Sequence, residues 1–322
     1  MRAARAVILG CLLSVLLSFG LSSPAKAQVS CTLTGGPLAF GTLNVVTGLP
    51  AYASGTATGT CTSTIGFPIT GYACLDIGTG TGGISGGERA MASGGNLLPF
   101  EVRSTPGSAT EIGDGTTWPS AGPMTISLPA TGTASVSFPV VAIVRPQGVL
   151  PAPGTYTSTF TGAAFRLYGT SNAVTTCAQA NAAVQYAVTG SLLVTATVTN
   201  QCTVTASPLS FGTTSFMTAN IDVAAAVTVT CNASTPVTVS LDNGSTGTGP
   251  TARQMSSGAN RVLYAAYWNS ARTTPAGLAS NSQGMAGVAN KVLSLPVYGR
   301  VPPQASKPPG SYVDTIGVTV SY

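Results

Sequence analysis

Alternation of apolar and small polar residues is the dominant local pattern along the chain. Residues 134–144 place an apolar side chain at every second position, and residues 192–198 do the same with threonines between them. A period of two is typical of strands with one buried face. Glycine-rich stretches such as GTGTGGISGG separate the alternating segments, and no stretch has the 3.6-residue period of an amphipathic helix. The pattern predicts an all-β protein.

A long internal repeat divides the chain. Eight of the twelve residues from Cys31 to Thr42 are identical to those from Cys202 to Thr213, 171 positions later. Further matches keep the same order: GTC with VTC, ERAMASGGN with ARQMSSGAN, and PAPGTY with KPPGSY. We therefore predict two tandem immunoglobulin-like β-sandwiches, the first over residues 28–189 and the second over residues 190–322.

The first 27 residues have the order of a secretory signal peptide. Arg2 and Arg5 precede an apolar run, and small residues stand before Gln28. The apolar run is too short to favour a membrane span. We expect cleavage before Gln28 and export of the mature chain.

Charge argues against a nucleic-acid partner. Only 7% of the residues are charged, and the formal net charge of the whole chain is +5. Removal of Arg2, Arg5 and Lys26 leaves 10 basic against 8 acidic residues, a net charge of about +2 with no basic cluster. Nucleic acid is therefore not an expected partner.

Cysteine usage predicts structural disulfides. Six cysteines remain after the leader with its Cys11 is removed, and an even number in an exported chain favours disulfides. There is no C-x-x-C spacing and no histidine, so we expect neither a metal site nor a cofactor. The repeat suggests pairing within each domain, and elimination supplies the third pair, although sequence does not prove the connectivity. The expected pairs are Cys31 with Cys61, Cys202 with Cys231, and Cys74 with Cys177.

Motifs that could indicate catalysis lack their partners. GTGTGG from Gly78 and GISGG from Gly83 match nucleotide-binding and hydrolase patterns, but neither has a strand–turn–helix context, and Ser85 has no histidine to activate it. Glu101, Glu111 and Asp114 could form a glycosidase pair, but turn and solvated positions are the simpler interpretation. We expect no enzymatic activity.

One arginine stands at matching positions of the repeat. Arg89 precedes Met91 by two residues, and Arg253 precedes Met255 in the same way. Duplication at equivalent positions favours a scaffold role, such as an arginine that binds backbone carbonyls at a turn.

Several segments of the second repeat resemble a known family. CTVTASPLSFG, a second cysteine about 30 residues later, RQM, LPVYGRVPPQ and GSYVDTIGVTVSY together resemble the spore coat protein U domain of secreted pilins from archaic chaperone–usher pili. The resemblance covers nearly all of the second domain and, more loosely, the first. It implies a pilin that lacks its last strand, is held by a periplasmic chaperone, passes an outer-membrane usher, and is completed by the donor strand of an adjacent subunit.

Two-domain members of this type resemble the tip adhesin of such a pilus. The resemblance implies an adhesive N-terminal domain on a C-terminal pilin domain, located at the cell surface and active in adhesion and biofilm formation. The implied target is a hydrophobic or host surface.

The last segment of the chain fits a strand with one unpaired edge. Its alternating residues would line the acceptor face for a donor strand, and Asp314 departs from the apolar pattern near the start, where it could reach water. An uncovered face of this kind would require a partner strand. The predicted acceptor residues are Tyr312, Ile316, Val318, Val320 and Tyr322.

The two ends of the first domain suggest a direction of assembly. Cleavage at Gln28 would leave only three residues before Cys31, so we expect the mature chain to accept a strand without donating one, as a terminal subunit would. Residues 182–188 alternate before Gly190 and Ser191, and we predict that they close the first domain from within its own chain. An ordinary linker strand is the alternative.

Apolar residues in turn-rich segments of the first domain are candidates for surface contact. Packing onto their own sandwich is the alternative, whereas exposed apolar patches usually mark binding surfaces. The candidates are Leu97, Leu98, Phe100, Trp118, Val149 and Leu150. Val149 and Leu150 are the preferred pair, because they lie between Gly148 and Pro151, which suit a stiff exposed loop.

Two other functions remain open. A carbohydrate-binding module would use Trp118, Tyr52 or Tyr72 as sugar platforms. A structural coat or shaft pilin would polymerise without being confined to the filament end.

Overall fold

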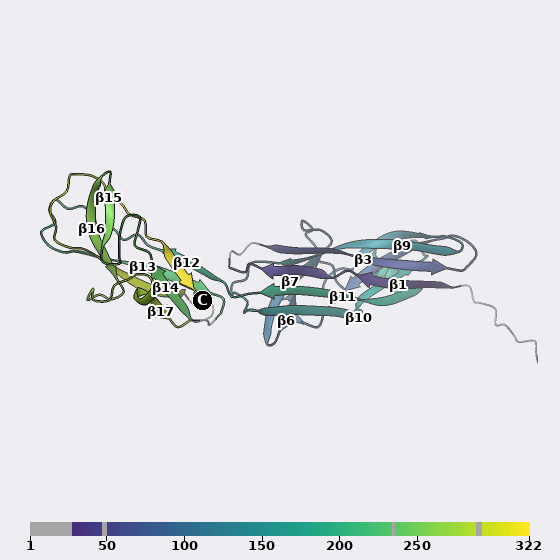
Figure 1. Ribbon diagram of the computed structural model, residues 1–322. Coiled ribbons are helices and arrows are strands. Elements are labelled where there is room, and N and C mark those ends of the chain that lie inside the picture. Colours follow the sequence, from purple (N-terminus) through teal and green to yellow (C-terminus); the bar gives the residue numbers. More distant parts are fainter. Residues whose placement is uncertain (1–27, 47–49, 234–235, 288–291) are drawn as a thin grey trace, which may run out of the picture.

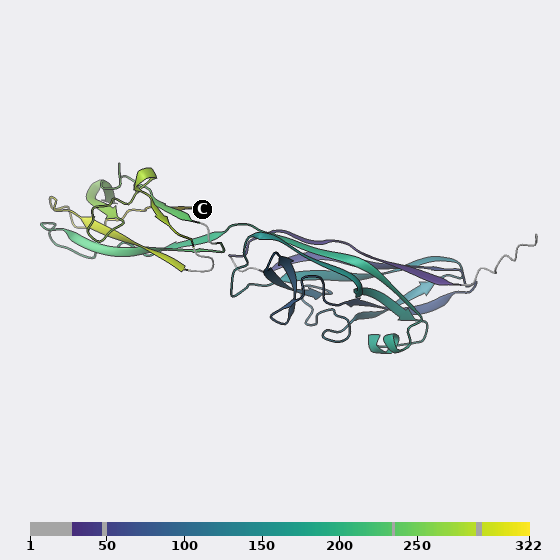
Figure 2. The same ribbon diagram turned by 90° about the horizontal axis from the view of Figure 1, so that it is seen from below.

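Two β-rich units lie end to end in the computed structural model, which describes residues 28–46, 50–233, 236–287 and 292–322 (Figure 1). The view from below shows the same extended arrangement (Figure 2). Within the described ranges, helix is limited to α2 (Cys177–Ala182) and the 3₁₀ helix η1 (Ala279–Asn281). Neither has the length needed to cross a membrane. The all-β prediction is confirmed, while the predicted signal peptide, residues 1–27, lies outside the described residues.

The N-terminal unit, residues 28–198, contains eleven strands among its described residues. Its strands are β1 (Val29–Gly35), β2 (Leu38–Leu43), β3 (Ala51–Ser63), β4 (Ile69–Ile77), β5 (Ile84–Ser85), β6 (Glu88–Ser93), β7 (Asn96–Arg103), β8 (Ala121–Leu128), β9 (Gly132–Val144), β10 (Gly154–Thr170) and β11 (Tyr186–Val198).

Two groups of strands enclose the core of this unit. One group has the order β1-β3-β9-β7-β6, and the other has the order β8-β4-β10-β11-β2. Alternating apolar residues of both groups form one buried cluster. Phe100 of β7 and Phe160 of β10, both fully buried, meet edge to face at 6.3 Å.

Strand β11 closes the N-terminal unit from within the same chain. It pairs antiparallel with β10 over residues 186–198, and its second edge pairs in parallel with β2. Closure from within the same chain was predicted for residues 182–188, but only residues 186–188 of that segment lie in β11, and most of the closing strand was assigned to the second domain.

The boundary predicted at residues 189/190 falls inside β11. Residues 191–198 remain paired with β10, so they belong to the N-terminal unit. Gly190 does not interrupt the strand: a Cβ at this position would overlap the Leu33 carbonyl, so the glycine permits close packing. We therefore propose residues 199–201 as the connection between the units.

The C-terminal unit, residues 202–322, contains eight strands among its described residues. They are β12 (Cys202–Ala206), β13 (Ile221–Cys231), β14 (Val237–Leu241), β15 (Arg253–Ser257), β16 (Asn260–Tyr267), β17 (Gln283–Met285), β18 (Val292–Val301) and β19 (Val318–Ser321).

The strand order of the C-terminal unit matches that of eight strands of the N-terminal unit. The sheet β12-β13-β18-β16-β15 repeats β1-β3-β9-β7-β6, and β17-β14-β19 repeats β8-β4-β10. Described residues of the C-terminal unit provide no counterpart of β11, and the counterpart of β2, residues 209–214, is not a strand. The duplication predicted from sequence is therefore a duplication of topology, which differs at the edge where β11 and β2 pair. The immunoglobulin-like assignment of each sandwich stays a prediction.

All three predicted disulfides are formed. Two of them join matching strand pairs, β1 with β3 and β12 with β13, and the third fixes α2 to β4. The pairs are Cys31–Cys61, Cys202–Cys231 and Cys74–Cys177.

Two polar side chains, one of them buried, join the two units. Gln201 accepts a hydrogen bond from Val45 N at 2.9 Å, and its own backbone N donates to Asn232 Oδ1 at 2.9 Å. Asn232, which is completely buried, donates through Nδ2 to the carbonyl oxygens of Pro151 at 3.2 Å and Thr199 at 3.0 Å. These bonds fix the start of the C-terminal unit against the loops at one end of the N-terminal unit.

Candidate functional site

An open groove crosses the C-terminal unit at the place that β11 fills in the N-terminal unit. Its walls come from residues 206–217, after β12, and residues 306–318, which lead into β19, and its volume is about 1190 Å³. Val227, Leu241 and Tyr264 contribute apolar surface to its floor. Among the described strands β19 pairs only with β14, so the edge that faces the groove has no ladder partner.

Residues that β11 covers in the N-terminal unit are uncovered at the matching positions of the C-terminal unit. Leu33 is 6% exposed, whereas its counterpart Val204 is 41% exposed. Phe160 is fully buried opposite Leu192 of β11, whereas its counterpart Ile316 is only half-buried. The same difference separates two further matched pairs, Leu38 with Leu209 and Tyr156 with Tyr312.

A repeated hydrogen bond supports this matching of positions. The hydroxyl of Tyr156 donates to the Ala152 carbonyl at 2.7 Å, and that of Tyr312 donates to the Pro308 carbonyl at 2.8 Å. Each tyrosine therefore binds the backbone four residues before it, which fixes the start of the corresponding segment in the same way.

The final segment has the alternation expected for an acceptor face. Tyr312, Ile316, Val318 and Val320 are half-buried, whereas Gly317 and Thr319, which alternate with the last three, are exposed. Tyr322 is 54% exposed. The structure thus places the predicted residues along the groove and β19, and their role in strand acceptance stays a prediction.

Asp314, which the sequence suggested could reach water, is half-buried and held by hydrogen bonds. Its carboxylate accepts hydrogen bonds from Ser245 N at 2.8 Å and from the Tyr264 hydroxyl at 2.7 Å. Burial, together with this bond, raises the pKa of Tyr264. Asp314 therefore fixes the glycine-rich loop after β14, as Ser158 fixes the Gly82 backbone in the N-terminal unit.

The pole of the N-terminal unit farthest from the C-terminal unit is formed by three connections. These are residues 64–68, 129–131 and 171–185. The pairing of β3 with β9, β4 with β8 and β10 with β11 places all three at the same end of the unit. Gly66 N donates to the Ala130 carbonyl at 2.9 Å, which joins the first two. Phe67 is 61% exposed on this pole, and Val184 is 39% exposed. We call this surface the free pole.

The predicted adhesive residues do not lie on the free pole. Val149 is 71% exposed, and Leu150 is half-buried, but both belong to the loop whose Pro151 contacts Asn232 of the C-terminal unit. Leu97, 43% exposed, lies at the same junction end, because it pairs with Ala92 and that residue pairs with Thr157 near the start of β10.

Three other predicted candidates are internal or partly covered. Leu98 and Phe100 are fully buried, so surface contact by these two residues was a wrong prediction: their side chains fill the core. Trp118 is half-buried, and the Arg89 guanidinium carbon lies 4.0 Å from its ring centroid. Sequence signals that could have separated these from exposed residues are weak, because Phe100 sits in an alternating strand but follows a Gly-Gly-Asn turn.

The alternative sugar platforms do not converge. Tyr52, 49% exposed, stands at the junction end of β3, whereas Tyr72 stands near the free pole on β4. Trp118 has one ring face covered by Arg89. These three aromatic side chains therefore do not form one stacking surface.

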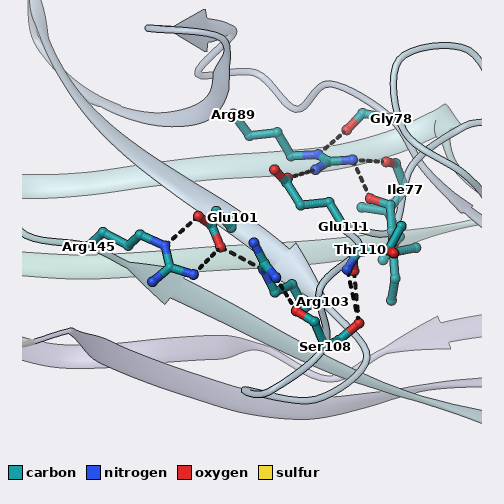
Figure 3. Close-up of polar contacts among 10 residues, drawn as sticks. Ile77, Gly78, Arg89, Glu101, Arg103, Ser108, Thr110, Glu111 and Arg145 are labelled. Atoms are coloured by element: carbon teal, nitrogen blue, oxygen red, sulfur yellow. Dashed lines mark hydrogen bonds and ion pairs between the residues drawn. The ribbon is translucent and has the colours of Figure 1, made fainter.

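The candidate catalytic carboxylates are bound to arginines, as Figure 3 shows. Glu101 accepts hydrogen bonds from Arg145 Nη2 at 3.0 Å and Arg103 Nε at 2.6 Å. These bonds hold the pKa of Glu101 below its usual range, and the bond from Arg145 has the largest effect. Glu111 forms an ion pair with Arg89 at 3.0 Å, and burial raises the pKa of the Glu111 carboxyl group.

The remaining motifs have structural explanations. Asp114 accepts a hydrogen bond from Thr116 N at 3.0 Å, which makes it a turn residue. In the GTGTGG loop, a Cβ on Gly82 would overlap the Ala90 carbonyl, so the glycine permits close packing of the loop.

Arg89 and Arg253 have the scaffold role that their repetition predicted. Both are fully buried. Arg89 donates to the Gly78 carbonyl at 2.7 Å, and Arg253 donates to the matching Asp242 carbonyl at 2.9 Å. Burial lowers the pKa of Arg89 to about 10, so its guanidinium stays charged at neutral pH.

Comparison with known proteins gives the family and the fold. The family model of the Spore Coat Protein U domain matches residues 16–163 and 188–319. None of the curated proteins compared with the sequence matches it. The CsuC-CsuE chaperone-tip adhesion subunit pre-assembly complex, from archaic chaperone-usher Csu pili of Acinetobacter baumannii, contains a chain of similar fold. That chain is 15% identical, with a TM-score of 0.53 and coverage of 91% of this chain and 100% of its own length.

A second solved structure, the CupB6 tip adhesin from Pseudomonas aeruginosa, is 12% identical over 92% of this chain and 93% of its own, with a TM-score of 0.34. Each family match overlaps one of the two topological repeats described above, although the second match begins at residue 188, inside β11. The chain therefore belongs to the Spore Coat Protein U domain family and carries that domain twice.

Proposed function

We propose that this protein is the tip subunit of an archaic chaperone–usher pilus. In this proposal the N-terminal unit adheres to a surface, and the C-terminal unit accepts a donor strand from the adjacent pilin. The observation that carries the proposal is the contrast between two matching slots, one filled by β11 and the other an open groove of about 1190 Å³.

Strand addition would remove two unfavourable features at once. It would pair the free backbone edge of β19, and it would cover Val204, Leu209 and Ile316. If a donor buries four or five apolar side chains at about 1.5–3 kcal/mol each, the gross gain is on the order of 10 kcal/mol. A gain of that size is comparable to the stability of a whole domain.

The direction of β11 supports a position at the filament end. It runs antiparallel to β10 and continues through residues 199–201 into the C-terminal unit. A donor with the same direction in the groove would leave at the end of the C-terminal unit that faces away from the junction. The next subunit would then extend the filament away from the N-terminal unit, which leaves the free pole outermost.

Before assembly the groove would need a substitute partner. A periplasmic chaperone supplies one in this proposal, followed by transfer at an outer-membrane usher. The chaperone-bound state of the similar Csu complex supports this order. The protein would therefore pass through the periplasm and finish on the cell surface.

We place the adhesive surface on the free pole. Phe67 is the most exposed large apolar side chain of that pole. Dehydration of apolar loops on a hydrophobic or host surface would supply the binding energy, and many pili per cell would multiply weak contacts during biofilm formation. The predicted Val149–Leu150 pair is a less favourable site, because its loop contacts the C-terminal unit.

Matched substitutions test the adhesive surface. Phe67→Ser should reduce attachment of piliated cells to polystyrene, while Val149→Ser should leave it unchanged. Neither change should alter the melting temperature, because both side chains are exposed. Attachment that depends on Val149 and not on Phe67 would move the adhesive site to the junction end.

Strand acceptance requires a separate test. The mature chain should copurify with its periplasmic chaperone, and hydrogen exchange of the β19 backbone amides should slow when the adjacent pilin replaces the chaperone. A free monomer with β19 amides already fully protected would contradict the proposal. Incorporation along the whole filament would favour a structural shaft pilin instead.

A further inference from the structure

Two carboxamide side chains bond across the junction between the units. Gln201 Nε2 donates to the Leu43 carbonyl at 2.5 Å, and Gln201 Oε1 accepts a hydrogen bond from Val45 N at 2.9 Å. Asn232 Nδ2 donates to the Pro151 carbonyl at 3.2 Å. Each of these bonds reaches a backbone group of the N-terminal unit, so the contact depends on the course of its loops and not on their side chains.

A carboxamide is the side-chain group that this contact requires. The Leu43 carbonyl needs a donor and the Val45 N–H needs an acceptor, and glutamine supplies both from one planar group. An ionised carboxylate has no proton to donate, and an ammonium group accepts no hydrogen bond. The two carboxamides are also held together, because Gln201 N donates to Asn232 Oδ1 at 2.9 Å. They therefore form one preassembled contact.

Both carboxamides flank the disulfide at the start of the C-terminal unit. Gln201 directly precedes Cys202, and Asn232 directly follows Cys231. Because the two cysteines stand opposite each other in the ladder of β12 with β13, their neighbours lie side by side at the end of the unit that faces the junction. The disulfide-linked strand pair thus fixes the position of the two side chains.

The N-terminal unit lacks this pair of side chains at the matching end. Ser30 precedes Cys31, and Thr62 follows Cys61, so two hydroxyl groups stand where the second copy has carboxamides. A hydroxyl group on a shorter side chain does not bridge two backbone groups of another unit as Gln201 does. The end of this unit next to the free pole is therefore not built for a contact with a preceding unit.

The opposite end of the C-terminal unit repeats the loops that receive the carboxamides. Strand β13 begins and strand β18 ends at this end of the unit. Gln304 N donates to the Met217 carbonyl at 2.9 Å, which joins the two loops. We call residues 213–217 and 304–308 the distal pole. Its matching residues are Thr214 for Leu43, Phe216 for Val45, and Lys307 for Pro151.

The distal pole is exposed and continuous with the groove. Thr214 and Lys307 both line the groove, and both are exposed. Phe216 is 71% exposed, whereas its counterpart Val45 at the junction is half-buried. Only residues 199–201 separate β11 from β12 in this chain. A donor strand with a similarly short connection, leaving the groove at this end, would bring the folded body of its own subunit against these residues.

We infer, on the basis of the proposed strand acceptance, that the distal pole binds the body of the adjacent pilin through carboxamide side chains that flank the first disulfide of that pilin. The residue before its first cysteine would bridge the Thr214 carbonyl and the Phe216 N–H. The residue after its second cysteine would donate to the Lys307 carbonyl. Because residues 209–214 are not a strand in the free unit, this contact would form after the donor strand has entered.

A tandem chain tests this contact, with a second copy of the C-terminal unit as the probe. A glycine-serine linker and a copy of residues 186–322 are added after Tyr322 of the mature protein. Strand β19 runs towards the junction, so the copied β11 can return antiparallel to it through the groove and bring the copied unit to the distal pole. Segmental isotope labelling restricts the measurement to the original chain.

Hydrogen exchange of two sets of backbone amides separates the two events. The β19 amides report strand acceptance, and the Phe216 amide reports the contact with the copied unit. One variant carries Gln201→Met in the copy, which keeps the length of the side chain but removes its donor and acceptor. The matched control carries Asn260→Ala in the copy, at the exposed first residue of β16.

The expected result differs for the two sets of amides. The β19 amides should be protected in every tandem chain. The Phe216 amide should exchange about fivefold more slowly with the unchanged copy and with the control than in the mature protein, as for one hydrogen bond of typical net strength. With Gln201→Met in the copy it should exchange as in the mature protein. The Val45 amide, bonded to the original Gln201, should be unaffected throughout.

Two results would overturn different statements. A Phe216 amide that exchanges equally fast with the unchanged copy and with the Gln201→Met copy, while β19 is protected, would refute the carboxamide contact and leave strand acceptance intact. Amides of β19 that stay unprotected in every tandem chain would refute strand acceptance, and with it the contact that depends on it.

Discussion

Phe160 and Ile316 stand at matching positions of two topologically equivalent units, yet the first is fully buried and the second is not. The strand β11 alone accounts for the difference, because it covers Phe160 and has no counterpart over Ile316 among the described residues. The comparison shows the same strand framework with and without its last strand, and its apolar edge is uncovered where that strand is missing.

The position of β11 makes the comparison more informative. Only residues 199–201 separate it from β12, the first strand of the C-terminal unit. It therefore stands before that unit as a donor strand would stand before a pilin, while it completes the unit that precedes it. Within one chain the protein contains the joint that we propose it forms with its neighbour.

A charge in the middle of β11 gives the largest expected effect. Val194→Asp places a carboxylate at a fully buried position, where it should destabilise the N-terminal unit by about 3–5 kcal/mol. Urea unfolding followed by circular dichroism measures the loss. Leu193→Asp, on the exposed face of the same strand, is the control with little effect. Equal tolerance of both changes would show that β11 does not close the unit.

Truncation of the two matched side chains compares the slots directly. Phe160→Ala should destabilise the N-terminal unit by about 3–5 kcal/mol, because it leaves a cavity in a packed core. Ile316→Ala should cost distinctly less in the free protein, where the side chain is half-buried. The cost of Ile316→Ala should grow when a donor strand is present, as measured by the unfolding midpoint of the complex. Equal costs in the free protein would mean that the groove is already closed.

The polar joint between the units should have an intermediate effect. Asn232→Ala removes the partners of the Pro151 and Thr199 carbonyls, which should cost about 1–3 kcal/mol. We expect the two units to unfold at more widely separated denaturant concentrations in this variant. Asn260→Ala, at the exposed first residue of β16, is the control. A variant that unfolds like the parent would show that these bonds do not couple the units.

Acid sensitivity should show the smallest difference. The pKa of Glu101 is lowered from 4.5, chiefly by the hydrogen bond from Arg145, so its ionised form stabilises the folded N-terminal unit. That contribution is present above the unfolded-state pKa and is lost as the pH falls through the lower folded-state pKa.

Glu101→Gln should therefore be less stable than the parent at pH 7, with the difference shrinking towards pH 3. Thermal unfolding across that pH range provides the measurement. In the C-terminal unit the pKa of Asp222 is also lowered, mainly by Arg300, but this pair is more exposed and Asp222→Asn should change stability less. A difference for Glu101→Gln that persists at pH 3 would show that the ion pair is not its cause.

Local patterns were sufficient to predict the strands, the repeat and the cysteine pairs. Alternation marks half-buried strands because successive side chains point to opposite faces. The matching positions of Cys31 and Cys202 in the two copies indicated the same pairing in each. These predictions depended on residues close in sequence or related by duplication.

The predicted domain boundary falls inside β11 because a glycine between two alternating segments can mean either a turn or a close contact within a strand. Gly190 resembles a break between strands, but it lies inside β11, where the Leu33 carbonyl leaves no room for a side chain. Local sequence does not distinguish a turn from such a close contact. The contact forms only after β1 and β11 are brought together.

Which loops share the free pole could not be predicted for a related reason. Val149 has the flanking Gly148 and Pro151 of an exposed loop, and it is exposed, but its end of the unit faces the junction. Which loops share a pole depends on the direction and register of strands far apart in sequence. The local pattern did not indicate Phe67 as a surface-contact residue, because a single apolar residue in a loop is common.

The sequence by itself determined a pair of β domains with disulfides inside each domain, because period-two alternation, duplication and cysteine spacing are properties of the chain. Only the tertiary structure decided that β11 fills one slot, that the matching slot is open, and which loops form the free pole. The reason is physical: burial and edge pairing arise between segments distant in sequence, and identical local patterns are buried or exposed according to which strand lies beside them.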